Sequence, residues 1–433
     1  MRSPISQRNR EPARLVAGCT AILSALAASA PPALAASAPK PAAPKPSAAA
    51  GFTVTKILAA PASTQSCDDL GFLNGNLFMG CQNATLSGGG GGTSTLVEAS
   101  PAGTVIKTWA IKDKIDGLAG DPMTHKVIVT LNEDANTRLA TVAPSAPASQ
   151  QVTYYSYSPS PQSSSAPPAL RSGGGTDHVS VDSAGNVLVT GSHARLKTGS
   201  AVFRVQLTPP SGAGGTGTAK LSPTFPDDAT AANGISGKGP VKLKLGDVDS
   251  GAIVPRSSPR FGGGYVIDDQ TALTLVFAQN LFSGTGITAL KTPYGLDDIT
   301  WATSNAGTLY VVDDGGTTTK GTSSIYKVTG PFTSNMVLAA NDGLSDQVDK
   351  VNLTTGGLTP LVRHLGTTKG LVYVNQSGSQ TPLALNEAPT AAASSSSSKG
   401  GSSNAALIVV IVVVVLGLLG GAVAIMRRRR PAA

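Results

Sequence analysis

The sequence predicts an all-β fold, a six-bladed β-propeller, followed by one C-terminal transmembrane α-helix. The chain of 433 residues contains 50 glycines and 30 prolines, a content typical of a turn-rich β protein. Between these turn residues lie short runs in which apolar and polar residues alternate, which is the period of a β-strand. An irregular internal repeat and an uncharged segment near the C-terminus complete the prediction.

The membrane prediction depends on residues 405–426, which carry no charge. A helix of this length rises about 33 Å, enough to cross a hydrocarbon core of about 30 Å. The stop-transfer residues Arg427, Arg428, Arg429 and Arg430 follow at once and mark the cytoplasmic side. The remaining tail, residues 427–433, is too short to hold a cytoplasmic enzyme.

The N-terminus resembles a secretory signal peptide over residues 1–35. Four arginines precede an apolar stretch at residues 15–30, and Ala33-Leu34-Ala35 gives the small-x-small pattern for cleavage after Ala35. An organelle transit peptide is the alternative, because the segment is rich in arginine and nearly free of acids. With the C-terminal span, the signal predicts a single-pass type I protein of the plasma membrane, its ectodomain outside the cytoplasm.

Two biased segments bracket the predicted ectodomain at residues 51–385. Residues 36–50 form an Ala/Pro-rich linker, and residues 386–404 form a flexible Ser/Gly-rich stalk. The formal charge of +8 belongs mainly to the two ends: six basic residues lie within residues 1–50 and four within residues 427–430. The ectodomain is therefore close to neutral, and the sequence gives no electrostatic support for binding nucleic acid.

The internal repeat consists of an acid or lysine, a few apolar residues, a turn and an apolar strand. Its six copies begin near positions 69, 116, 177, 247, 298 and 370. Each interval can hold a four-stranded blade and a loop of variable length. We expect the early strand at residues 52–58 to complete the blade that contains residues 371–374 and so close the ring. The alternatives are seven blades, a β-sandwich pair and a solenoid.

The fifth copy carries a resemblance to a known family. Leu296-Asp297-Asp298-Ile299-Thr300-Trp301, then Gly307-Thr308-Leu309-Tyr310-Val311-Val312 and Ser324-Ile325-Tyr326-Lys327-Val328, is similar to a repeat of the NHL and gluconolactonase-type six-bladed propellers. The likeness implies that these three segments belong to one blade. This superfamily contains both enzymes and binding modules, so the resemblance does not choose between them.

Cys67 and Cys81 are the two cysteines that remain after the predicted cleavage. An even pair in an oxidising compartment predicts a disulfide. Asn74-Gly75 between them is a typical hairpin turn, which would place the cysteines opposite each other.

Four aspartates recur where the first strands of the repeats begin: Asp69, Asp116, Asp177 and Asp298. In a propeller these positions meet at one mouth of the central channel. Their oxygens would suit Ca²⁺ or another divalent metal, which gluconolactonase-like propellers hold at this place. The alternative is that each aspartate binds backbone amides at a strand entry. His178, beside Asp177, is the weak candidate for a general base.

These features predict a membrane-anchored, non-catalytic binding module for an extracellular protein, glycan or small molecule. The alternative is a divalent-metal-dependent lactonase or esterase-like hydrolase with carboxylates at the channel mouth. Within the membrane span, Gly417 and Gly421 form a GxxxG pattern that would allow a homodimer through close helix packing.

The predicted topology is tested with protease added to intact cells. The bulk of residues 51–385 should be trimmed, because the arginines after residue 426 hold the C-terminus inside. Full protection of that bulk, or a full-length chain that stays in solution without detergent, would contradict the topology.

Overall fold

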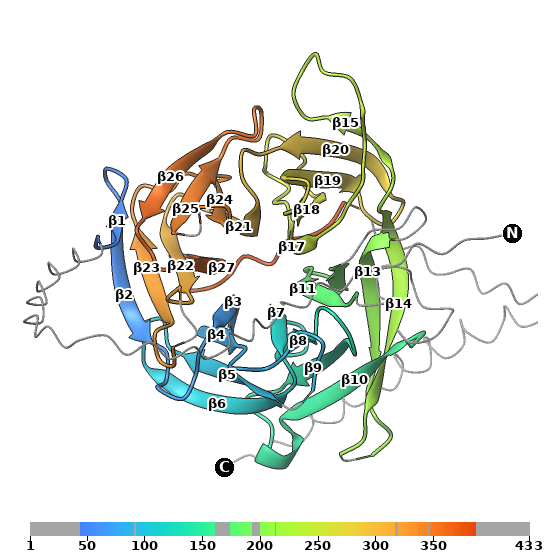
Figure 1. Ribbon diagram of the computed structural model, residues 1–433, viewed down its shortest axis with the longest axis vertical. Helices are drawn as coiled ribbons and strands as arrows, with labels where there is room; N and C mark the ends of the chain where they lie inside the picture. The colour runs from blue at the N-terminus through green and yellow to red at the C-terminus, as the bar shows by residue number, and fades with distance from the viewer. Residues whose placement is uncertain are drawn as a thin grey trace, which may run out of the picture. The chain divides into compact units, whose positions relative to one another are not determined.

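The computed structural model describes residues 44–386, except 91, 161–173, 193–199, 213, 317–318 and 345. Over this range the chain is built of β-strands, with one short 3₁₀ segment, η1 (Ala148–Gln150). The strands form antiparallel four-stranded units around a common centre (Figure 1). The predicted all-β fold is confirmed, and the arrangement is propeller-like.

The first three units follow the chain in simple order. Their strands are β3 (Cys67–Leu73), β4 (Asn76–Cys81), β5 (Thr93–Ala99) and β6 (Val105–Lys112); β7 (Ile115–Asp121), β8 (Lys126–Leu131), β9 (Arg138–Val142) and β10 (Val152–Ser158); and β11 (Thr176–Val181), β12 (Val187–Gly191), β13 (Ser200–Thr208) and β14 (Gly217–Pro226). The outer strands β10 and β14 pair in parallel, which joins the second and third units into one eight-stranded sheet.

The fourth unit also follows the chain, with an extension at its outer edge. It consists of β17 (Val248–Ile253), β18 (Tyr265–Asp269), β19 (Thr274–Asn280) and β20 (Thr285–Lys291). The strands β15 (Thr230–Asn233) and β16 (Val241–Lys242) extend it beyond β20, because β15 pairs in parallel with β20.

The fifth and sixth units are interleaved in sequence. The fifth contains β21 (Leu296–Trp301), β24 (Val337–Asn341), β25 (Gln347–Val351) and β26 (Leu358–Arg363), while the sixth contains β27 (Thr368–Asn375), β22 (Gly307–Asp313), β23 (Ser324–Thr329) and β2 (Thr53–Ala59). The expectation that β21, β22 and β23 share one blade is therefore wrong. The chain leaves the fifth unit after its first strand, contributes two strands to the sixth unit and then returns.

The six inner strands form a closed ring. β3, β7, β11, β17, β21 and β27 each lie beside the next, and β27 lies beside β3 (Figure 1). All six predicted repeat starts fall in these strands or next to them.

The ring is closed by the N-terminal strand, as the sequence predicts. β2 pairs with β23 at the outer edge of the sheet that contains β27. Before it, the two-residue strand β1 (Ser47–Ala48) pairs with β26. Part of the segment predicted as a linker is therefore strand, because these two residues find backbone partners at a sheet edge.

The packing at the centre leaves little room for side chains. A Cβ atom added at Gly71 would come within 2.5 Å of the Leu118 side chain in the next unit. One added at Gly117 would lie 2.5 Å from the Asp177 carbonyl oxygen, again in the next unit. Glycine at these positions permits the close approach of neighbouring inner strands.

The predicted disulfide is present. Cys67 and Cys81 are bonded and lie opposite each other on β3 and β4. The turn between the strands is Asn74-Gly75, and both residues have positive φ, as a two-residue hairpin turn requires.

Several predicted features lie outside the described residues. They are the signal peptide with Ala35, most of the stalk, residues 405–426 with Gly417 and Gly421, and the four C-terminal arginines. In the described range, no helix is long and apolar enough to cross a membrane.

Closure by β2 leads to a stability prediction. Leu58, 6% exposed, packs in a core cluster with Tyr310 and Ile325, so Leu58→Ala should lower the free energy of unfolding by about 2–4 kcal/mol. Lys56→Ala on the exposed face of the same strand is the matched control and should cost less than about 0.5 kcal/mol. Equal unfolding midpoints for the two variants in urea would contradict the role of β2 in closing the ring.

Candidate functional site

The candidate site is built on a β-bulge that recurs in all six inner strands. In each strand two residues lie opposite a single residue of the neighbouring strand, near the point where the inner strand begins. A bulge leaves its residues partly unpaired and re-aims their side chains. Because the bulge occurs at the same place in all six inner strands, the side chains of the bulge residues together form a ring at one end of the channel.

The first bulge position is charged in every unit. Its occupants are Asp68, Asp116, Asp177, Asp249, Asp297 and Lys369. We call these six residues the bulge ring. Asp116 and Asp177 of the predicted set belong to it, whereas Asp69 and Asp298 lie one position later. In the two Asp-Asp pairs, the position equivalent to Asp116 and Asp177 is therefore the first aspartate, Asp68 or Asp297, and not the second. The sequence contains a signal for this choice. Asp116 and Asp177 each lie two residues before an apolar residue, Leu118 or Val179, and the same spacing before Leu70 and Ile299 identifies Asp68 and Asp297.

Asp69 and Asp298 make the same backbone contacts in two different units. Asp69 accepts hydrogen bonds from the amides of Leu70 (2.6 Å) and Leu118 (2.6 Å), the latter in the next unit. Asp298 likewise accepts from Ile299 and from Leu371 of the next unit, both at 2.6 Å. These carboxylates therefore join neighbouring inner strands, as the structural alternative for the predicted aspartates requires.

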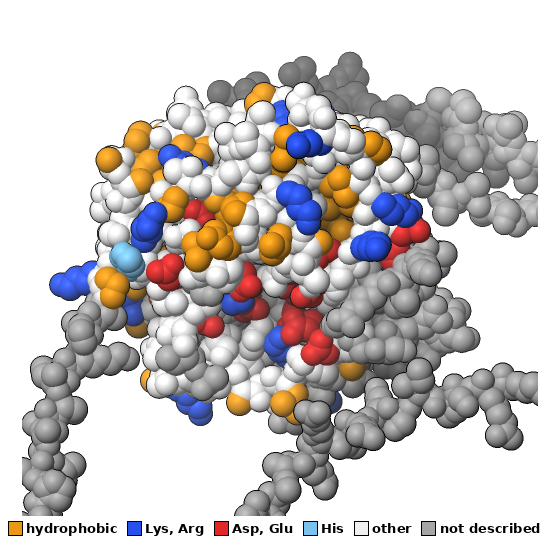
Figure 2. All heavy atoms as spheres, turned by 45° about the horizontal axis from the view of Figure 1, so that its top comes forward, with side chains coloured by type: hydrophobic (Ala, Val, Ile, Leu, Met, Phe, Trp, Pro, Cys, Tyr) orange, Lys and Arg blue, Asp and Glu red, His pale blue; other side chains and the backbone are white. Residues whose placement is uncertain are grey.

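A cavity of about 300 Å³, here called the acidic mouth, contains the whole bulge ring. Its wall also includes Asp69, Asp298, Asp314, Glu133 and Lys114. Among its described wall residues, nine carboxylates face two lysines. Asp and Glu side chains also gather around a hollow on the face drawn in Figure 2.

The two lysines pair with only part of this negative charge. Lys114 Nζ lies 2.8 Å from Asp116 Oδ1 and also contacts Glu133. Lys369 Nζ lies 2.5 Å from Asp297 Oδ1 and 3.5 Å from Asp68 Oδ1. Burial would lower the pKa of Lys369, but the carboxylates of Asp297, Asp68 and Asp249 raise it overall, so the lysine remains charged.

The remaining charge shifts the titration of the aspartates. Burial, followed by repulsion from Asp249, Glu133 and Asp116, raises the pKa of Asp177 well above its ordinary value. Burial also raises the pKa of Asp297 to about 7, against the attraction of Lys369. It raises the pKa of Asp298 to about 8, against its two backbone hydrogen bonds.

Asp177 differs from the other members of the bulge ring. It is only 8% exposed, yet no described residue donates a hydrogen bond to its carboxylate. Asp68 and Asp249, by comparison, accept hydrogen bonds from Gln82 (2.6 Å) and Gln270 (2.7 Å). The carboxylate of Asp177 is open to the acidic mouth, where water, a cation or a proton can satisfy it.

His178 lies at the inner end of the acidic mouth and is neutral. Burial lowers its pKa to about 4, against a hydrogen bond with the backbone of Gly251. Its nearest acid is Asp69, with Nδ1 to Oδ2 at 3.9 Å, rather than its sequence neighbour Asp177. This distance exceeds a hydrogen bond, so the described geometry contains no oriented acid–histidine pair.

The predicted metal site has mixed support in the geometry. The four predicted aspartates do line one cavity, the acidic mouth. However, within the described part of the chain no group of three or more His, Cys, Asp or Glu side chains is arranged to hold a metal ion. Oxygens of Asp69 and Asp298 are already engaged by backbone amides. Ca²⁺ binding therefore stays a prediction.

Comparison with known proteins adds the following. No family model and no curated protein matches this chain. A protein of unknown function from Bacteroides caccae matches with 10% identity and a TM-score of 0.39, over 71% of this chain and 86% of that one. A protein from Lactobacillus plantarum matches with 12% identity and a TM-score of 0.39, over 72% and 89%. A GH43_1 enzyme from Xanthomonas citri, in complex with xylose, matches with 11% identity and a TM-score of 0.34, over 66% and 91%.

The raised pKa of Asp177 predicts how stability depends on pH. In the unfolded chain this carboxyl loses its proton near pH 4, whereas in the folded chain it keeps the proton to higher pH. The folded state therefore binds more protons, and its stability falls as pH rises above about 4. Asp177→Asn, which removes the charge and breaks no described hydrogen bond, should raise the free energy of unfolding at pH 8 by about 1–3 kcal/mol, with little effect at pH 4.

Asp228→Asn is the matched control, because Asp228 lies on the surface beside Lys242. Its removal should change the free energy of unfolding by less than about 1 kcal/mol at either pH. Urea titrations at pH 4 and pH 8 measure both variants. A destabilised Asp177→Asn at pH 8 would contradict the electrostatic account of the acidic mouth.

Proposed function

We propose that this chain is a membrane-anchored binding module whose acidic mouth takes up a cationic group of its ligand. The six units would be the blades of a six-bladed propeller, carried at the plasma membrane by residues 405–426. The observation that carries the proposal is the bulge ring, where five of six equivalent positions hold aspartate and one of them, Asp177, lacks a donor.

The electrostatics favour a positively charged ligand. Nine carboxylates line the acidic mouth with two lysines, and the raised pKa values of Asp177, Asp297 and Asp298 show that burial and mutual repulsion oppose their ionisation. An ammonium or guanidinium group that enters the acidic mouth would lower this repulsion and supply the donor that Asp177 lacks. The extracellular protein, glycan or small molecule expected from the sequence is thereby narrowed to a ligand with a basic group. Nucleic acid, a polyanion, is disfavoured.

The test uses the full chain in phosphatidylcholine vesicles and a fluorescent hexalysine peptide, with hexaglutamate as the probe of opposite charge. Hexalysine should bind, and its affinity should fall as salt is added, whereas hexaglutamate should not bind. Asp177→Asn with Asp249→Asn should weaken hexalysine binding about tenfold or more, because two carboxylates are lost from the bulge ring.

The matched control removes two carboxylates that do not line the acidic mouth, with Asp228→Asn and Asp346→Asn. It should bind hexalysine within about twofold of the unchanged protein. Equal losses in the two double variants would show that only the general surface charge attracts the peptide, and the proposal would fail.

A metal-dependent hydrolase is the second candidate, and the adjacent pair Asp297 and Asp298 favours it. Their pKa values of about 7 and about 8 permit proton exchange near neutral pH, as acid–base catalysis requires. Turnover of a lactone or ester that depends on added Ca²⁺ and is lost in Asp297→Asn would favour this candidate. Hexalysine binding without such turnover would favour the binding module over the hydrolase.

A further inference from the structure

A second cavity, of about 440 Å³, lies in the channel beyond the acidic mouth. We call it the chamber. It shares three wall residues with the acidic mouth, Asp69, His178 and Asp298, and its remaining wall comes from the later residues of the inner strands and from the chain after β27. Phe72, Leu73, Ile253 and Trp301 make much of that wall apolar.

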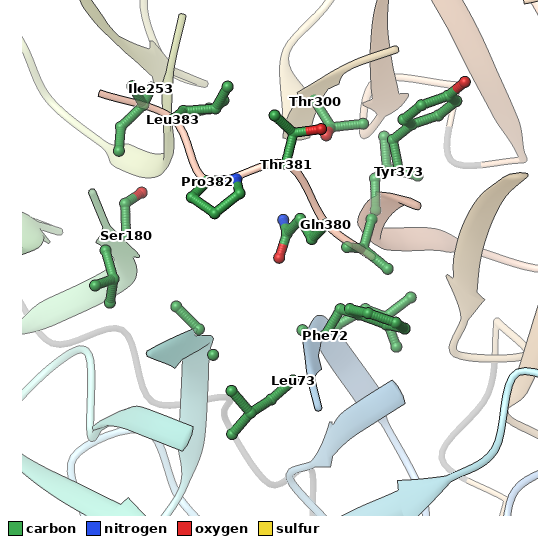
Figure 3. Close-up of a pocket in the computed structure, with 18 of the residues that line it drawn as sticks. Phe72, Leu73, Ser180, Ile253, Thr300, Tyr373, Gln380, Thr381, Pro382 and Leu383 are labelled. Carbon is green, nitrogen blue, oxygen red and sulfur yellow. The ribbon is translucent and has the colours of Figure 1, made fainter. Parts of the chain in front are cut away.

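A segment that we call the strap, residues 376–386, crosses the chamber. Figure 3 shows Gln380, Thr381, Pro382 and Leu383 running from the side of Tyr373 to that of Ile253, with the side chain of Gln380 in the open space. The strap is fixed mainly near its ends. A turn bonds the Asn375 amide to the Ser379 carbonyl, and at the far end the Leu383 carbonyl accepts from Ser183.

The far end of the strap is tied more firmly than its middle. Leu385 is buried in the core cluster of the fourth unit, and the Asn386 amide donates to the Gly263 carbonyl. Between the two ends, the Thr381 hydroxyl pairs with that of Thr303 at 3.0 Å and accepts a hydrogen bond from the Asn375 side-chain amide at 3.4 Å, and Leu383 packs against the core cluster of the fourth unit.

The chamber offers no free charge, in contrast to the acidic mouth. Its wall includes three carboxylates, and backbone amides occupy all of them: Asp69 and Asp298 as described above, and Asp182 through the amides of Ala184 (2.9 Å) and Asn186 (2.7 Å). His178, at the boundary with the acidic mouth, is neutral because of its burial. A charged ligand would lose its hydration here without gaining a counter-charge.

One polar group of the chamber wall lacks a partner. Trp301 is 2% exposed, and its indole N–H makes no hydrogen bond with any described residue. That nitrogen is itself fully buried, and Trp301 packs in the core cluster of the fourth and fifth units, so the N–H is not open to the chamber. An apolar pocket with few polar groups is also the usual form of a small-molecule site.

We propose that the chamber binds a neutral, largely apolar small molecule, and that the strap covers it there. This site is separate from the proposed cation site. The two cavities meet at the wall residues that they share, Asp69, His178 and Asp298.

The experiment uses the full chain in phosphatidylcholine nanodiscs and the neutral naphthyl ketone dye Prodan as the probe. Trp109→Phe leaves Trp301 as the single tryptophan of the chain. Bound dye should quench Trp301 emission in a saturable way, because Trp301 lies in the chamber wall. Gln380→Phe, which fills the chamber from the exposed side chain of the strap, should raise the half-saturation concentration about tenfold or more.

Gln376→Phe is the matched control, since Gln376 is exposed on the same strap and does not line the chamber. It should leave the half-saturation concentration within about twofold. Thr300→Phe, which fills the chamber from β21, is the second variant and should act like Gln380→Phe. Quenching that is not saturable, or is equal in Gln380→Phe and Gln376→Phe, reports dye in the lipid and overturns the proposal. Hexalysine binding is measured on the same samples, so failure at the chamber and failure at the acidic mouth are told apart.

Discussion

The close approach of six inner strands at one centre is the constraint on which the rest of the structure depends. Each strand must bury its edge against the next, and the space at the crossing admits glycine where a Cβ would clash, as at Gly71 and Gly117. The bulges near the start of these strands turn charged side chains towards one end of the channel. The acidic mouth is therefore a consequence of the way in which the ring is packed, repeated six times.

The same packing explains why the two aspartates of a pair have different roles. The first bulge residue, such as Asp68 or Asp297, lines the acidic mouth beside Lys369. The second, Asp69 or Asp298, turns to the neighbouring strand and accepts its amide. One residue along the chain thus separates a carboxylate that can meet a ligand from one that holds the ring together. Lys369, the single basic member of the bulge ring, reduces the repulsion at the point where the ring closes.

The sequence could predict those parts of the fold that depend on local pattern. The starts of the internal repeat lie in or next to all six inner strands, and the turn Asn74-Gly75 predicted the hairpin that the Cys67–Cys81 bond joins. Two other features depend on contacts between distant segments. The exchange that pairs β22 with β27 has no local signal, since β21 and β22 are adjacent in sequence and alternate in the same way. The choice between Asp297 and Asp298 depends on the register of strand pairing, because a shift of one residue exchanges the faces on which the two side chains lie.

The interleaving of the last two units also affects how the ring is held closed. The sixth unit draws β2 from the N-terminal side, β22 and β23 from the middle of the last third, and β27 from the C-terminal side. Opening the ring at this unit would expose core residues of all three segments, among them Leu58, Val312 and Val372. This closure joins β2 to the later strands through contacts between segments far apart in the sequence, and such contacts form slowly. Once formed, they bury apolar surface from all three segments together. Both cavities are lined by the inner strands of that closed ring, so the shape of each depends on the ring remaining closed.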